Sequence, residues 1–227
     1  MPQPYLSVHR PFTSLQPRDT ARVRPQALRP KNKFWPPSLK SSDRLRPIPE
    51  WEPFSLPADS SLLPSLPDAA RVWIHPAASP LSEDIQHEVL PRLEAFIDEW
   101  SSHQQNVQGG ATILHDRFVC LAGARIDGAD PSGCAIDDAT HAVDAVADAH
   151  GIEWVPSLHV IYRVYANTIA AVPRPTFQER ADAGHVTTDT MVFDPSVTTL
   201  GAVRNGNFEQ PAGQSWHADA FSLPTPA

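Results

Sequence analysis

Three side chains that can do chemistry recur at helical spacing in the segment DPSGCAIDDATHAV, residues 130–143. Cys134, Asp138 and His141 stand at positions i, i+4 and i+7, so a helix here places a thiol, a carboxylate and an imidazole on one side. A thiol in a first helical turn gains thiolate character from the helix N-terminus, and a nearby histidine can accept its proton. These residues are therefore the candidate catalytic set of a thiol-dependent enzyme or redox sensor.

The same segment has two non-catalytic interpretations. Ser132 and Gly133 lie where a helix N-terminus presents free backbone amides, which makes this pair a candidate site for an anionic ligand. Alternatively, Ser132 only caps the helix and Cys134 packs as a small hydrophobic residue. The carboxylates of Asp137 and Asp138 favour this last, structural interpretation, because like charge opposes formation of a thiolate.

Three histidines form a second candidate site. His75, His115 and His159 stand at the ends of expected strands, and in a split sheet of order 4-1-3-2 those ends meet at one edge. Three imidazoles, with Asp116 as a further ligand, suit zinc or another transition metal. Strand-end histidines are also commonly just solvated, and no other cofactor is expected.

The elements that must position these groups follow from apolar periodicity and from chain breakers. The expected strands are residues 71–75, 111–115, 118–124 and 157–165. The expected helices are residues 82–100 and 132–150. Ser82 is expected to cap the first helix, Pro91 to kink it or mark its true start, and Gly151 to end the second helix. Gly109-Gly110 is expected to break the chain. The order is that of a ferredoxin-like split β-α-β-β-α-β sheet, and the fold class is α+β.

Residues 166–227 are expected to form a C-terminal α/β appendage packed on a core of residues 63–165. A short helix is expected with Thr176 and Glu179 as its capping box, followed by a strand in DTMVFD and a loop pinned by Phe208 and Trp216. Two helices cover only one face of a split sheet. The other face must be covered by this appendage or by a second copy of the chain, so a homodimer is an alternative.

Charge and proline divide the chain into two parts. Residues 1–67 hold 14 of the 25 prolines, with 10 Lys and Arg against 5 Asp and Glu. We expect residues 1–62 to be a disordered Pro/Arg-rich arm or a mis-assigned start; a basic arm for an acidic partner is the alternative. Residues 68–227 hold 8 Arg and no Lys against 21 Asp and Glu.

The lysine-free part excludes several classes of function. A P-loop needs a lysine on the β- and γ-phosphates, and a Schiff-base enzyme needs an amine. The acidic surface repels nucleic-acid phosphates, so no nucleic-acid partner is expected. Two cysteines give no disulfide framework, and no apolar run approaches the ~20 residues of a membrane span. A cytoplasmic protein is therefore expected.

Six segments are together similar to one known family. ARVWIHP, FIDEW, DRFVCLAGARID, SGCAID, DTMVFD and QSWHADAF occur in this order between about residues 66 and 221. They resemble small bacterial proteins of a type common in Bacteroidetes that are catalogued as "ABC transporter ATPase" and lack Walker motifs. The resemblance implies that name but supplies no catalytic residues. This chain has neither GxxxxGK[ST] nor an LSGGQ-like signature, so we expect no P-loop ATPase activity.

The sequence thus favours a small binding or interaction protein whose partner is an unidentified protein or small molecule. The alternative is the thiol-dependent enzyme or redox sensor that uses Cys134 with His141. These two functions differ in whether the thiol is accessible and whether the imidazole lies within hydrogen-bonding reach of it.

Overall fold

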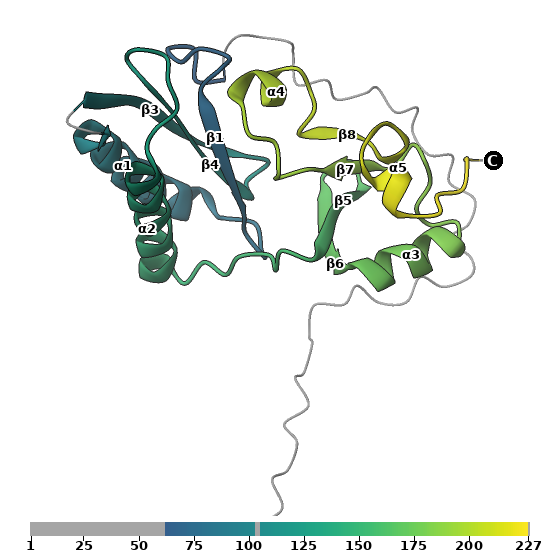
Figure 1. The fold of residues 1–227 in the computed structure, drawn as a ribbon. Helices are drawn as coiled ribbons and strands as arrows, with labels where there is room; N and C mark the ends of the chain where they lie inside the picture. Colours follow the sequence, from purple (N-terminus) through teal and green to yellow (C-terminus); the bar gives the residue numbers. More distant parts are fainter. Residues whose placement is uncertain (1–61, 103–104, 227) are drawn as a thin grey trace, which may run out of the picture. The chain divides into compact units, whose positions relative to one another are not determined.

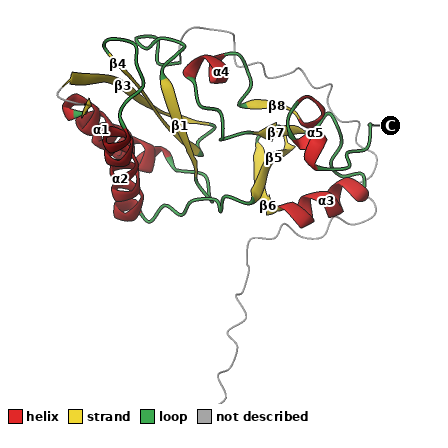
Figure 2. Ribbon diagram, viewed as in Figure 1, coloured by secondary structure: helices red, strands yellow, loops and turns green. Residues whose placement is uncertain are grey.

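The computed structural model describes residues 62–102 and 105–226, so the expected N-terminal arm lies outside the described residues except for Leu62. The described chain is α+β, as predicted, with two antiparallel four-stranded sheets (Figures 1 and 2). None of its described helices is long and apolar enough to cross a membrane.

The first sheet has the order β1-β4-β3-β2 and the second has the order β6-β5-β7-β8. The strands of the first sheet are β1 (Arg71–Pro76), β2 (Ser101–Ser102), β3 (Gln105–Leu114) and β4 (Phe118–Arg125). Those of the second are β5 (His159–Tyr165), β6 (Thr168–Pro173), β7 (Met191–Phe193) and β8 (Glu209–Pro211). The helices are α1 (Glu83–Glu99), α2 (Gly133–His150), α3 (Arg174–Asp182), α4 (Leu200–Arg204) and α5 (His217–Ala220), with a 3-10 turn, η2, at Ala212–Gln214.

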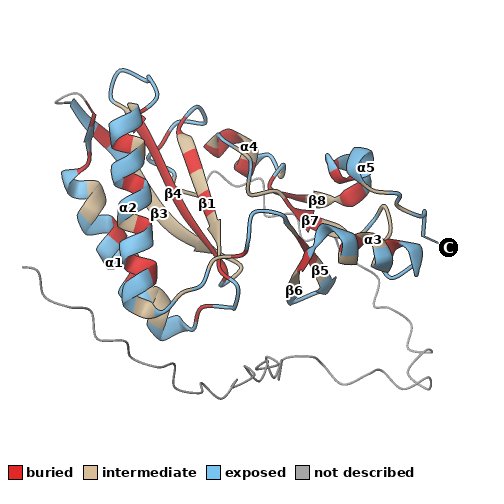
Figure 3. Cartoon of the chain, turned by 60° about the horizontal axis from the view of Figure 1, so that its bottom comes forward, coloured by how far each residue is buried: buried red, intermediate tan, exposed pale blue. Residues whose placement is uncertain are grey.

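The two long helices begin and end where local signals predict. The side chain of Ser82 accepts a hydrogen bond from the backbone of α1, and that of Ser132 does the same for α2. Gly151 ends α2 in the left-handed conformation, with φ 62°. Pro91 neither starts nor ends α1 but lies inside it. Both helices cover one face of the first sheet (Figure 3).

The glycine pair at residues 109 and 110 does not break the chain, contrary to the prediction, because it lies within β3. Gly109 pairs across the sheet with Gly123, and the Trp100 ring packs over both positions. A Cβ at Gly109 would meet the Ile97 side chain at 2.9 Å, and one at Gly123 would collide with the Trp100 ring. The strand therefore uses glycine to admit a large aromatic side chain.

The predicted ferredoxin-like sheet is not confirmed. The first three predicted strands do take the predicted order, since β1 pairs with β4 and β4 with β3. The fourth predicted strand, β5, instead pairs with β6 and β7 in the second sheet. Among the described residues, the free edge of β1 is bridged only at Arg71, to Thr199, and just past its other end at Ala77, to Trp154. A local hairpin between β5 and β6, through residues 166 and 167, replaces the predicted long-range pairing.

The chain's own second sheet covers the other face of the first. Neighbouring residues of β4 point to opposite faces, so Val119 packs beneath the helices while Phe118 joins a second core cluster. That cluster includes Phe193 and Phe208 from the second sheet, and the Phe118 and Phe193 ring centroids lie 4.9 Å apart. This face was expected to be covered by the C-terminal appendage or by a second copy of the chain, and in the structure the chain covers it itself. The second sheet contains β5, which ends at residue 165, and β6, which begins at residue 168, so it spans the expected boundary between core and appendage.

Two buried or half-buried arginines fasten these layers through backbone carbonyls. Arg117, the last residue of the turn between β3 and β4, donates to the carbonyls of Ala77, Ala78 and Ile169 at 2.5–2.8 Å. Arg204, at the end of α4, donates to carbonyls of the first described residues, Leu62, Leu63 and Leu66, at 2.9–3.2 Å. Each guanidinium thus joins segments distant in sequence.

The C-terminal region differs from its prediction in two details. Helix α3 begins at Arg174, with Pro175 in its first turn and no side-chain cap, so Thr176 and Glu179 do not form the capping box. The strand in DTMVFD is confirmed as β7. Phe208 is fully buried as expected, but Trp216 is half-exposed, and the neighbouring His217 is buried in its place.

Candidate functional site

The start of α2 is capped by one hydrogen bond of its own and tied to β2 and to the end of α1 by two others. The Ser132 hydroxyl accepts from the backbone of Ala135 at 3.4 Å, and the Ser132 backbone donates to the Ser102 hydroxyl at 2.9 Å. The Trp100 indole N–H donates to the Ala135 carbonyl at 2.9 Å. The Ser132 side chain therefore acts as a helix cap, and Gly133 has open space beside it. These contacts favour the structural interpretation of this helix start over an anion site.

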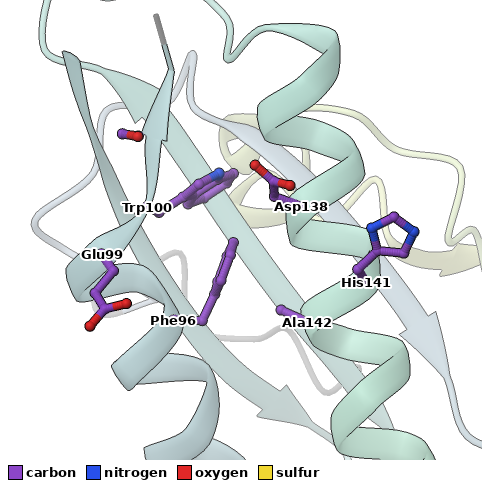
Figure 4. Close-up of a pocket in the computed structure, with 7 residues that line it drawn as sticks. Phe96, Glu99, Trp100, Asp138, His141 and Ala142 are labelled. Atoms are coloured by element: carbon purple, nitrogen blue, oxygen red, sulfur yellow. The ribbon is translucent and has the colours of Figure 1, made fainter. Parts of the chain in front are cut away.

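The predicted catalytic residues share an exposed face of α2 but do not form a bonded set. Cys134 is a free, exposed cysteine, and Asp138 and His141 are also exposed. Among the described residues, no hydrogen bond joins the thiol, the carboxylate or the imidazole to one another. Figure 4 shows the His141 ring pointing away from the Asp138 carboxylate. The other cysteine, Cys120, is buried, and its burial raises the pKa of that thiol well above the usual range.

A shallow pocket of about 430 Å³ lies between α1 and α2 and contains two of the three predicted residues (Figure 4). Its lining residues are Phe96, Glu99, Trp100, Ser101, Asp138, His141 and Ala142. Its apolar side is formed by Phe96 and Trp100, whose ring centroids lie 5.4 Å apart. Its polar side is formed by carboxylates from both helices, Glu99 from α1 and Asp138 from α2. The pocket thus combines aromatic surface with negative charge.

Sequence reasoning missed the α1 half of this pocket. Phe96, Glu99 and Trp100 lie in the FIDEW segment at the end of the first expected helix, and none of them was predicted as a site residue. The signal present in the sequence is FIDEW, in which two aromatic residues four positions apart flank two acids at the end of a helix. The opposing glycines at 109 and 123, which position Trp100, come from other strands and give no local signal.

The three predicted metal ligands occupy separate surroundings. His75 packs against Trp154, with ring centroids 5.5 Å apart, and burial lowers its pKa despite the nearby charge of Asp144. His115 lies in the β3–β4 turn beside the second sheet, and His159 begins β5. Within residues 62–102 and 105–226, no group of three His, Cys, Asp or Glu side chains is placed to hold a metal ion.

His115 instead belongs to a buried charged cluster, which we call the Glu209 cluster and define as His115, Arg163 and Glu209. His115 Nε2 lies 2.9 Å from Glu209 Oε2, and the Arg163 guanidinium donates to the other carboxylate oxygen. The Arg163 guanidinium also lies 3.2 Å from His115 Nδ1. His115 and the adjacent Asp116 both have positive φ, 51° and 52°, so the turn is held in a conformation that ordinary residues seldom adopt.

The Glu209 carboxyl group is shielded from water yet stays acidic. Burial raises the pKa of Glu209, but the hydrogen bonds and charges of His115 and Arg163 together lower it by more than burial raises it. The net pKa therefore lies below the ordinary 4.5. The three side chains satisfy one another inside the contact between the sheets. The cluster therefore has the features of a structural ion-pair network. Its histidine, His115, contacts the Glu209 carboxylate and is not placed as a metal ligand.

A second buried histidine lies under the C-terminal segment. His217 is completely buried, stacked on Trp216 at a centroid distance of 3.8 Å, and its Nδ1 lies 2.9 Å from the Ser215 hydroxyl. Its Nε2 is also buried and has no hydrogen-bond partner among the described residues. Burial is the main cause that lowers its pKa to about 4, with Asp194 opposing and Arg174 reinforcing the shift. The imidazole is therefore neutral at pH 7.

Comparisons with known proteins add no identity to this site. A scan against protein-family models, a search of curated proteins and a search of solved structures each found no match. The resemblance to the proteins catalogued as "ABC transporter ATPase" therefore stays a prediction from the sequence.

Proposed function

We propose that this chain is a non-catalytic interaction protein that binds a basic segment of a partner through the outer surface of α1 and α2. The observation that carries this proposal is the charge of that surface. Helix α1 has six carboxylates and a single arginine, and α2 has four carboxylates and neither lysine nor arginine. All ten carboxylates are exposed: Glu83, Asp84, Glu88, Glu94, Asp98, Glu99, Asp137, Asp138, Asp144 and Asp148.

The helices carry about as much negative charge as the whole chain, whose formal net charge is −8. A surface of one sign attracts an oppositely charged partner, speeds its association and suppresses partners of like charge. The pocket between the helices adds an aromatic contact to this field. By contrast, the charged groups of the second sheet are buried in the Glu209 cluster and are not available to a partner.

The proposal is tested with the full chain and a labelled peptide that repeats arginine, lysine and glycine. Fluorescence anisotropy should show binding that weakens steeply as salt rises from about 50 to about 300 mM, because screening shortens the range of exposed charges. A glutamate-containing counterpart of the peptide should not bind. If the basic peptide shows no salt-dependent binding, the carboxylates serve only to hydrate the protein and the proposed function is wrong.

A second candidate function, a thiol-dependent enzyme or redox sensor, is favoured by one observation. Cys134 is exposed in the first turn of α2, where helix amides stabilise a thiolate. The pH dependence of its alkylation, with Cys120→Ala as background, tests this function. We expect Cys134 to be alkylated slowly at neutral pH, like an ordinary exposed cysteine, and a Cys134→Ser variant to change little in stability because the site is exposed. Rapid alkylation below neutral pH that is slowed in His141→Ala would establish a reactive nucleophile and displace our proposal.

A further inference from the structure

The structure assigns a more specific role to the pocket between α1 and α2. We propose that it binds the guanidinium group of an arginine side chain in the partner's basic segment. This inference rests on the proposed function, because it names the point on the acidic surface that anchors the partner. Its support comes from the aromatic side of the pocket, from its carboxylates and from the end of α1.

The aromatic side of the pocket is held rigidly. Trp100 is fixed by its indole hydrogen bond to the Ala135 carbonyl, by an edge-to-face contact with Trp73 at 5.9 Å and by the glycines beneath it. Phe96 packs on Trp100 and remains half-buried, so part of its surface faces the pocket. A preformed aromatic surface attracts a cation through its π-electrons and loses little conformational entropy on binding.

The carboxylates of the pocket lack a cation within the protein. Glu99 and Asp138 are exposed, and neither has a hydrogen-bond or ion-pair partner among the described residues. Glu99 and Asp98 also lie at the C-terminal end of α1, where the helix dipole is negative and a basic residue is normally favoured. The last turn of α1 contains no basic residue. Two carboxylates on opposite sides of the aromatic rings, together with the helix end, therefore give the pocket a negative potential (Figure 4).

The geometry favours a guanidinium over other cations. A guanidinium is flat, so it can stack on Phe96 while its fork of N–H donors faces the Asp138 carboxylate, and Glu99 adds negative charge from the other helix. A divalent metal needs several close ligands, and no such group of three occurs among the residues that the structure describes. The volume of about 430 Å³ is within the range of ligand pockets and accommodates one long side chain.

The test uses the full chain and a capped arginine–glycine repeat peptide, with lysine and citrulline counterparts. Citrulline keeps the shape of arginine but has no charge. The double variant Glu99→Gln, Asp138→Asn should weaken binding of the arginine peptide at least about tenfold, as expected for the loss of two directed charge pairs. The control variant Glu94→Gln, Asp148→Asn removes the same charge from the same helices outside the pocket and should weaken binding less than about twofold.

A second measurement reports the pocket in the unchanged protein. The indole N–H resonance of Trp100 should shift when the arginine peptide is added and should not shift with the citrulline peptide. Equal weakening in the pocket and control variants, or an unmoved Trp100 resonance while the peptide binds, overturns the arginine site and leaves the proposed function standing. Equally tight binding of the lysine peptide overturns the preference for a guanidinium. No binding of any basic peptide overturns both proposals.

Discussion

The first sheet with its two helices and the second sheet with its short helices place ionisable side chains differently. On α1 and α2 all ten carboxylates are exposed, whereas Glu209 in β8 of the second sheet has 8% of its surface exposed and His217 in α5 has 0%. Exposed carboxylates add little to stability and remain available to a partner. Buried groups are strongly coupled to folding, because an unpaired charge inside the protein is costly. The comparison separates a surface suited to binding from an interior suited to holding the fold.

The largest effect expected from this difference is at Glu209. Glu209→Ala leaves the buried Arg163 without its carboxylate and should lower the free energy of unfolding by about 3–5 kcal/mol. Glu99→Ala, on the exposed helix surface, should change it by less than about 0.5 kcal/mol. Urea unfolding followed by circular dichroism measures both. Similar losses in the two variants would break the comparison.

The lowered pKa of Glu209 also predicts when its contribution disappears. Its pKa in the folded protein lies below the ordinary 4.5 of an unfolded chain, so the stabilising contribution is complete above pH 4.5. It is lost as the pH falls through the folded-state pKa. The difference in stability between wild type and Glu209→Ala should therefore be constant at neutral pH and shrink only below pH 4.5.

A second effect is expected from His217 in a different pH window. Its pKa falls from 6.5 to about 4 on folding, so the unfolded chain takes up a proton first as the pH falls. Stability should be full above pH 6.5 and decline between pH 6.5 and 4, by roughly 3 kcal/mol for a shift of this size. Burial also lowers the pKa of His75, so His217→Gln should reduce this slope without abolishing it, whereas Trp216→Phe keeps the histidine and should retain the full slope. An unchanged slope in His217→Gln would assign it to another group.

The smallest effect concerns the first sheet and its helices, whose stability should depend on packing around Trp100 and not on buried charge. Gly123→Ala places a methyl group against the Trp100 ring and should cost about 1–3 kcal/mol. Gly133→Ala, in the open first turn of α2, should instead stabilise the protein by about 0.4–1 kcal/mol. Thermal unfolding of the two variants should give melting temperatures on opposite sides of the wild type. A Gly123→Ala variant that melts at or above the wild-type temperature would show that Trp100 is not held by its glycine contact.

Local signals in the sequence predicted the two long helices well and the sheet topology poorly. Ser132 and Gly151 bound α2 as predicted, because capping depends on neighbouring residues. The hairpin of β5 and β6 was missed because residues 166 and 167 contain no glycine to indicate a tight turn. The Arg117 contact that ties β6 to the first sheet joins residues 52 apart, which no local pattern reveals.

The candidate site was half predictable for the same reason. Asp138 and His141 were found from their spacing on one helix, and both line the pocket. Glu99 joins them only because α1 and α2 pack side by side, and the position of Trp100 between the helices depends on the paired glycines of β3 and β4 beneath its ring. The pairing of His115 with Glu209 likewise depends on the register of two sheets, so a histidine predicted as a metal ligand was found beside a carboxylate.

The contacts of Arg204 have a consequence for the order in which this protein can fold during synthesis. Its guanidinium binds carbonyls 138–142 residues earlier in the chain, and Thr199 just before it bridges the free edge of β1. Contacts this distant form late, because a long loop must close first. A growing chain that has not reached α4 therefore lacks both the Thr199 bridge at one end of the β1 edge and the Arg204 contacts to residues 62–66. Residues 199–204 protect that end late in synthesis, while the middle of the edge has no strand partner among the described residues and stays a place where another strand can add.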